Sequence, residues 1–256
     1  MDNKKKVYVN RRPVTGPWGG GNKTLSGIVD YLSDIGSHGK PELTNLVSQT
    51  IRFSNFVIFP SDWARRAIQF KGKNYSIIEN APLSDFFENR SKNNIQDGKL
   101  KIVTHHWSNN KMKGFDIYEK LGDYCLKNSS VEFTYIGRYS EEFSKNGINV
   151  VEPKDVNFLK KELPKNHVYL TASMYEAGAN HVLEGMAAGL PVVYRSSGGS
   201  INEYCSKYGI EFENFDDLIE SIDNIRKNYY HFREKVATFS SNFDIKIKSY
   251  GDIILS

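Results

Sequence analysis

Two glutamates that flank a run of small residues constrain the fold of this chain more than any other feature. Glu176 opens the sequence EAGANHVLE, and Glu184 closes it eight positions later. Residues 166–172, just before the pair, form a short segment rich in β-formers that predicts a buried strand, whereas residues 181–188 predict a helix. A Gly-Leu-Pro turn then leads to a second expected strand at 190–194. This strand–helix–strand order is typical of a parallel α/β sheet, in which ligands bind beyond the carboxyl ends of the strands.

The segment between the two glutamates has the composition of a site for phosphates and hydroxyls. Gly178, between two alanines, lets the backbone approach a ligand closely. Free N–H groups at the start of the following helix favour an anion such as a phosphate. Glu184 lies about one turn into that helix, where its carboxylate can accept hydrogen bonds from a vicinal diol such as that of ribose. A plain loop with two solvated glutamates is the alternative, but the small residues and the later Gly198-Gly199 pair favour a ligand site.

These residues resemble the donor-binding signature of the retaining glycosyltransferases of the GT-B fold, glycosyltransferase group 1 (family 4). That signature has two glutamates separated by seven residues, a small-residue helix, Gly-Leu-Pro-Val-Val and a Gly-Gly loop. The resemblance implies that Glu176 hydrogen-bonds hydroxyls of the donor sugar and that Glu184 holds the ribose of the nucleotide. It also implies that four loop amides face the sugar and the diphosphate, those of Ala177, Gly178, Ala179 and Asn180. Ala177 stands where the family commonly has a glycine, and the usual aromatic residue between the loop glycines is absent.

A lysine-glycine pair earlier in the chain matches the same family. Residues 101–107 predict a strand, and Lys113-Gly114 precedes a helix expected at 115–127. In the family, a Lys-Gly pair at this place supplies a lysine to the donor diphosphate, so the resemblance assigns that role to Lys113. The family's phosphate arginine has no counterpart in the loop before Lys113. Three residues are alternatives for a second phosphate donor: His105, His106 and Lys111.

Two glycine-containing loops complete the predicted donor site. A strand expected at 131–138 ends in Gly137-Arg138, and its loop resembles the one against the nucleotide base, although a solvated arginine is an equal alternative. Three glycines, Gly19, Gly20 and Gly21, lie between a first strand at 4–10 and a first helix at 23–33. They match neither a Walker A loop nor a dinucleotide fingerprint, and a packing role is the alternative. They resemble the glycine loop of the GT-B N-terminal domain, which faces the donor phosphates and the acceptor.

The chain is expected to fold into two Rossmann-like, doubly wound α/β domains (GT-B), with the N-terminal one reduced. We expect a reduced, acceptor-side domain at 1–80, a linker at 81–98, a donor-binding domain at 99–229 and a tail at 230–256 that packs back on the N-terminal domain. The N-terminal part has room for only one helix, near 41–50, where the family has two or three further strand–helix units. After it we expect a strand at 55–59, a helix at 61–70 and a strand at 75–79. The chain is then a natural short form, a form with an internal deletion, or a protein that a partner completes.

Composition narrows the expected partners, location and cofactors of the protein. The formal net charge is +4 with scattered lysines, so nucleic acid is not an expected partner. No apolar run approaches the roughly 20 residues that span a bilayer, and no secretory signal accompanies Cys125 and Cys205, so a cytoplasmic protein is expected. Peripheral association with the inner face of a membrane is compatible with the mildly basic charge. No metal-ligand spacing and no Asp-x-Asp motif occur, so we expect neither a metal nor a cofactor beyond the nucleotide-sugar substrate.

The expected function is transfer of a sugar from a nucleotide-diphosphate sugar, such as a UDP sugar, to an acceptor hydroxyl with retention of configuration. The resemblance implies that Glu176 and Lys113 are catalytic and that a glycan, a lipid-linked molecule or another hydroxyl compound is the acceptor. The family suggests surface polysaccharide or lipopolysaccharide assembly. Two alternatives remain: a non-catalytic nucleotide-sugar-binding subunit, which would act with a partner or as an oligomer, and a GT-B sugar-nucleotide epimerase. A phosphorylase is disfavoured because it needs a pyridoxal-phosphate lysine in a longer chain.

Overall fold

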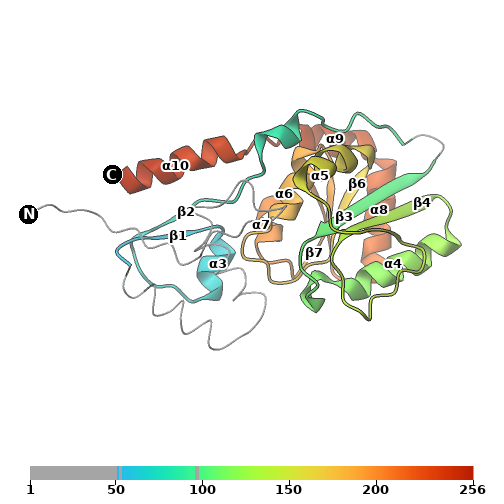
Figure 1. The fold of residues 1–256 in the computed structure, drawn as a ribbon, viewed down its shortest axis with the longest axis horizontal. Helices are drawn as coiled ribbons and strands as arrows, with labels where there is room; N and C mark the ends of the chain where they lie inside the picture. The colour runs from blue at the N-terminus through green and yellow to red at the C-terminus, as the bar shows by residue number, and fades with distance from the viewer. Residues whose placement is uncertain (1–50, 52–53, 96–97, 256) are drawn as a thin grey trace, which may run out of the picture.

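Six parallel strands form the central sheet of the chain, in the order β5-β4-β3-β6-β7-β8 (Figure 1). This is the strand order 3-2-1-4-5-6 of a doubly wound fold, and the order reverses between β3 and β6. The structure is a computed structural model that describes residue 51, residues 54–95 and residues 98–255. The strands are β3 (Leu100–His106), β4 (Val131–Gly137), β5 (Asn149–Val151), β6 (Val168–Thr171), β7 (Val192–Arg195) and β8 (Gly209–Phe212).

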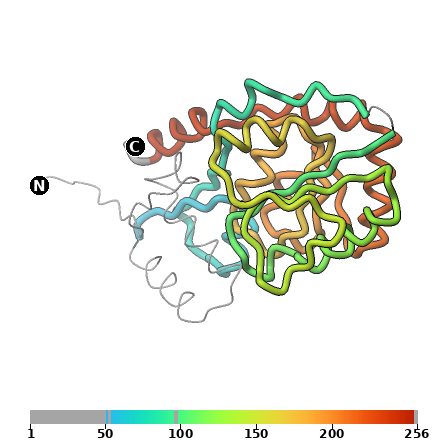
Figure 2. Tube along the Cα trace, turned by 45° about the vertical axis from the view of Figure 1, so that its right-hand side comes forward, coloured from blue at the N-terminus to red at the C-terminus, as the bar shows by residue number. Residues whose placement is uncertain are grey.

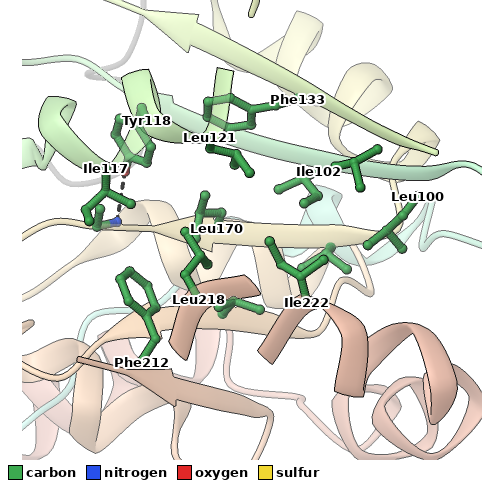
Figure 3. Packing of buried hydrophobic residues seen from close by; sticks show 14 of the residues in the cluster. Leu100, Ile102, Ile117, Tyr118, Leu121, Phe133, Leu170, Phe212, Leu218 and Ile222 are labelled. Atoms are coloured by element: carbon green, nitrogen blue, oxygen red, sulfur yellow. Dashed lines mark hydrogen bonds between the residues drawn. The ribbon is translucent and has the colours of Figure 1, made fainter. Parts of the chain in front are cut away.

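Helices cover both faces of this sheet, and each face has its own apolar core. On one face, α4 (Phe115–Lys127) and α8 (Phe215–Lys227) pack against the strands; Figure 3 shows Leu121 and Leu218 from these helices among strand residues such as Leu170. On the other face lie α5 (Val156–Glu162), α6 (Asn180–Ala187) and α7 (Ser200–Cys205). The alternation of strand side chains explains the two cores, because Tyr169 points to the second face and its neighbour Leu170 to the first.

A smaller unit lies beside the sheet. In it, β1 (Val57–Phe59) pairs in parallel with β2 (Tyr75–Ile77), and α3 (Asp62–Ala67) connects them. Ser61 caps α3 by accepting the Ala64 N–H at 3.0 Å. The helix ends three residues before the predicted boundary at 70, because Gln69 takes a left-handed backbone with φ of 55°.

The C-terminal tail returns toward this smaller unit. After α9 (Tyr229–Ala237), α10 (Phe243–Leu255) extends toward the β1–β2 side of the molecule (Figures 1 and 2). The Phe243 N–H donates to Pro82 O at 2.9 Å, and Lys246 Nζ lies 3.4 Å from Glu79 Oε2. The tail therefore contacts the segment that connects β2 to the main sheet, which contains the short helix η1 (Ser84–Phe87). None of the helices in the described ranges is long and apolar enough to cross a membrane.

The structure confirms most of the predicted elements of the main sheet. The helix expected at 115–127 is present with the same boundaries, and the strand expected at 131–138 ends one residue earlier, at Gly137. Helix α6 starts one residue earlier than predicted, and β7 starts two residues later and ends one residue later than the expected strand at 190–194. The first strand, the helices at 23–33 and 41–50, and the loop with Gly19, Gly20 and Gly21 lie outside the described residues.

Candidate active site at the switch point of the sheet

The loops after β3 and β6 meet at the carboxyl edge of the sheet, where the strand order reverses. The turn before α4, η2 (Lys111–Lys113) followed by Gly114, is pressed against the end of β6. Gly114 has φ of 82°, and a Cβ atom built on it would lie 2.3 Å from Ala172 O. The Met174 N–H donates to Met112 O at 2.9 Å and ties the two loops together. Only glycine fits this turn, and the close approach carries the preceding Lys113 to the β6 loop.

Lys113 and Glu176, one from each loop, form a largely buried ion pair. Lys113 Nζ lies 2.5 Å from Glu176 Oε1, and the two side chains are 17% and 8% exposed. Burial alone would raise the pKa of Glu176, but the positive charge of Lys113 and the hydrogen bond from its Nζ outweigh burial and hold that pKa below its ordinary value of 4.5. The site therefore presents an ionised carboxylate beside an ammonium group.

The backbone of Glu176 is held by the Gly198-Gly199 loop. Tyr175 has a left-handed backbone with φ of 57°, an uncommon conformation for an aromatic residue that is often found at functional sites. The Glu176 N–H donates to Gly198 O at 3.1 Å, and Glu176 O accepts the Ser200 N–H at 2.7 Å. Gly199 has φ of 73°, and a Cβ atom on it would lie 2.6 Å from Glu176 O. The second glycine pair of the sequence motif thus lets this loop pair with Glu176.

The loop amides differ from the sequence expectation in one respect. The Ala179 N–H, which the resemblance assigned to the donor, donates to Ser200 Oγ of the neighbouring loop at 3.2 Å. Ala179 provides no side-chain cap to α6, which leaves the first-turn N–H groups, starting at Asn180, without one.

Contacts with the smaller unit also shape this loop. Ala177 O accepts a hydrogen bond from Ser61 Oγ at 2.7 Å, and Gly178 O accepts one from Asn80 Nδ2 at 3.0 Å. A Cβ atom on Gly178 would lie 2.7 Å from Asn80 Nδ2 and 2.9 Å from Pro60 Cβ. The close approach that Gly178 permits is therefore to the smaller unit, which was not apparent from the sequence.

Glu184 points to the same edge of the sheet and pairs with a histidine. Its Oε2 lies 2.7 Å from His105 Nε2, and the side chains of Glu184 and His105 are 20% and 2% exposed. The sequence offered no signal for this contact, because 79 positions separate the two residues. The other two alternatives for a phosphate donor are engaged elsewhere: His106 Nε2 lies 2.7 Å from the Tyr118 hydroxyl, and exposed Lys111 contacts Glu142.

Arg138 lies at the outer end of this edge. It follows β4, is exposed, and places its guanidinium 4.0 Å from the centre of the Trp107 ring. Its N–H donates to His106 O at 3.0 Å, which fixes the start of the loop after β4. The pair gives this edge a cationic and aromatic surface next to the end of β3. Within the described residues, no group of three or more His, Cys, Asp or Glu side chains is arranged to hold a metal ion.

Two histidines beneath the ion pair are held neutral. Burial lowers the pKa of His181 to about 3, although Glu176 opposes the shift, and its Nε2 lies 3.0 Å from Thr171 Oγ1. Burial also lowers the pKa of His106 well below 6.5, and nearby His181 and Lys113 add to the effect. The folded protein therefore binds fewer protons at these rings than the unfolded chain does below pH 6.5.

Acidification is expected to destabilise the protein through His181 before most carboxylates titrate. Between an unfolded pKa near 6.5 and a folded pKa of about 3, only the unfolded chain protonates this ring, so stability falls as pH falls. The slope is about 1.4 kcal/mol per pH unit for one such group. Between pH 5.5 and 4.5, the free energy of unfolding measured with urea should change less steeply with pH in His181→Gln than in the wild type, by about that amount. The matched control is His231→Gln, at an exposed position, which should keep the pH dependence of the wild type. The same pH dependence of the free energy of unfolding in all three proteins would contradict the prediction.

The strand order and the site at its switch point define the described sheet as a Rossmann-like domain of the GT-B type. No protein-family model matches the sequence, and no curated protein matches it. Similarity to solved structures is nevertheless clear at the level of the fold. A TarM variant from S. aureus, solved with fondaparinux, alpha-GlcNAc-glycerol and UDP, has 18% identity and a TM-score of 0.64. That match covers 84% of this chain and 47% of TarM.

Two other solved glycosyltransferase structures show the same likeness. Anabaena Alr3699/HepE, solved with UDP and glucose, has 14% identity and a TM-score of 0.64, and the match covers 84% of this chain and 67% of that chain. WaaG, a glycosyltransferase involved in lipopolysaccharide biosynthesis, has 16% identity and a TM-score of 0.59, with 77% and 62% covered. The predicted fold class is therefore confirmed, and the chain spans about half the length of TarM.

Proposed function

We propose that this chain is a glycosyltransferase that moves a sugar from a nucleotide-diphosphate sugar to an acceptor hydroxyl with retention of configuration. One observation carries the proposal: Lys113, Glu176 and Glu184 come from separate segments and converge at the switch point of a doubly wound sheet. This is the place where such sheets bind nucleotides. The three residues are also those that the family resemblance assigns to the diphosphate, the sugar and the ribose.

The chemistry of the site suits departure of a diphosphate. As the bond between the sugar and the diphosphate breaks, negative charge grows on the leaving oxygen. Lys113 and the uncapped start of α6 at Asn180 would stabilise that charge as preorganised positive groups. The Glu176 carboxylate, kept ionised by Lys113, would accept hydrogen bonds from sugar hydroxyls. In this proposal the reaction needs neither a protein nucleophile nor a metal.

The solved relatives support the choice of ligands. UDP accompanies glucose in the HepE structure, and fondaparinux and alpha-GlcNAc-glycerol in the TarM variant, so a uridine nucleotide is the first donor to test. WaaG acts in lipopolysaccharide biosynthesis, and we propose a related role in surface glycan assembly, with a glycan or lipid-linked acceptor. A cytoplasmic location with peripheral contact to the membrane would suit such an acceptor.

A non-catalytic nucleotide-sugar-binding subunit is the second candidate. The observation that favours it is the loop between β3 and α4, where Lys113 is the cation directed at Glu176 and no arginine accompanies it at 107–113. The chain also covers only about half of TarM, which is compatible with completion by a partner. This candidate predicts donor binding without turnover, whereas the enzyme predicts release of the nucleotide diphosphate from its sugar conjugate.

Removal of the Glu184 carboxylate is expected to weaken nucleotide binding by about 1–3 kcal/mol, the usual cost of lost hydrogen bonds to a ligand. Calorimetric titration of the wild type and Glu184→Ala with UDP, GDP and their sugar conjugates tests this directly. Glu220→Ala, which removes an exposed carboxylate on α8, is the matched control and should bind like the wild type. Equal affinity of Glu184→Ala and wild type for the nucleotide would reject the site.

A further inference from the structure

We propose that His105 is a positioning residue that orients the Glu184 carboxylate toward the ligand. The inference rests on the proposed function, in which Glu184 holds the ribose, and it gives His105 a role that the sequence did not indicate. His105 is the sixth residue of β3 and is 2% exposed, so its side chain lies below the surface of the site rather than in it. It is thus placed to act on the ligand through Glu184.

A chain of hydrogen bonds joins three elements at this point. Glu184 Oε2 on α6 lies 2.7 Å from His105 Nε2 on β3, and His105 Nδ1 lies 3.0 Å from the Tyr169 hydroxyl on β6. The same hydroxyl accepts a hydrogen bond from the backbone N–H of His105 at 3.2 Å. Tyr169 is fully buried, so it holds the imidazole from the side opposite to the carboxylate. The ring is fixed at both nitrogens.

The direction of these bonds follows from the groups involved. An ionised carboxylate only accepts hydrogen bonds, so His105 Nε2 carries the proton that it donates to Glu184. In a neutral imidazole with that tautomer, Nδ1 accepts, and the Tyr169 O–H donates to it. Burial raises the pKa of Tyr169 well above 10, which keeps the phenol protonated for this purpose. This assignment gives both ring nitrogens of His105 and the Tyr169 hydroxyl compatible partners.

Close helix–strand packing brings Glu184 within reach of the histidine. A Cβ atom on the next residue, Gly185, would lie 2.5 Å from Cγ of the Tyr169 ring, so the glycine lets α6 rest directly on β6. His105 anchors one oxygen of the Glu184 carboxylate, Oε2. We expect the other oxygen, Oε1, to accept a hydrogen bond from a ligand hydroxyl.

Nucleotides with and without the ribose hydroxyls distinguish this role from a purely structural one. We would measure the Kd of UDP and of 2′,3′-dideoxyuridine diphosphate by calorimetry, or of the guanosine pair if the wild type binds GDP instead. His105→Asn, whose shorter amide does not reach Glu184, is expected to weaken binding of the ribose nucleotide about 3- to 10-fold. Binding of the dideoxy analogue should be unchanged. His105→Gln, whose amide nitrogen lies near the Nε2 position, should restore most of the affinity.

A matched control is available on the same strand. His106 is equally buried and adjacent, but it contacts Tyr118 and not Glu184, so His106→Asn should bind the ribose nucleotide like the wild type. Two results would overturn the positioning role alone. In one, His105→Asn binds the ribose nucleotide and the dideoxy analogue more weakly by the same factor. In the other, His105→Asn binds the ribose nucleotide like the wild type although Glu184→Ala has lost affinity for it. Absence of nucleotide binding in the wild type would instead overturn the proposed function, and the positioning role with it.

Discussion

Replacement of Lys113 by alanine is expected to lower the rate of sugar transfer about 100- to 1,000-fold, the usual effect of removing a group that stabilises developing charge. The reason is positional. The Lys113 side chain is 17% exposed, and its Nζ is held 2.5 Å from Glu176 Oε1, in the loop that we propose for the diphosphate. In so buried a place water screens charge weakly, so the ammonium group would act strongly on a leaving phosphate oxygen.

The rate is best measured as release of the nucleotide diphosphate from the donor that binds the wild type. Lys111→Ala is the matched control, because this lysine lies on the same short helix but is exposed and contacts Glu142. It should retain wild-type activity. Since Lys113→Ala leaves the buried Glu176 without its cation, the double variant Lys113→Ala/Glu176→Gln shows whether a loss of stability contributes. A folded Lys113→Ala protein with unchanged turnover would exclude a role for this lysine in catalysis.

Replacement of Gly114 by alanine is expected to destabilise the protein by about 3 kcal/mol and to move Lys113 away from Glu176. Two costs add. A left-handed backbone, here with φ of 82°, costs a residue with a Cβ atom about 1–2 kcal/mol. The Cβ atom would also lie 2.3 Å from Ala172 O, and the resulting overpacking typically costs about 1–3 kcal/mol. Relief of this clash requires the turn before α4 to withdraw from the end of β6.

Urea unfolding and the donor-release assay together test this prediction. Gly98→Ala separates the two costs, because Gly98 also has a positive φ, of 69°, but an added Cβ atom would meet nothing within 4 Å. The control should lose only about 1 kcal/mol, the cost of the backbone conformation, and should keep its activity. If the two variants were equally stable, the close approach at Gly114 would not be a determinant of the site.

Local pattern was sufficient to predict the elements that carry the site. The helix at 115–127 has the predicted boundaries, and the strand at 131–137 ends one residue before the predicted end, because apolar periodicity and chain-breaking residues act over short sequence distances. For the same reason Glu176 was correctly placed in a loop and Glu184 in a helix. The parallel sheet also followed from the alternation of strands and helices.

The partners of these side chains depend on strand order, which local pattern does not specify. Lys113 reaches Glu176 because β3 and β6 are neighbours in the sheet, although 63 positions separate the two residues. His105 on β3 reaches Glu184 on the helix after β6, and Asn80 reaches Gly178 from the segment after β2. Each contact needs the main chain of distant segments to be fixed first. Short motifs of the sequence thus determine which chemical groups the site contains. Tertiary packing determines which of these groups pair, because only packing brings distant segments within hydrogen-bond distance.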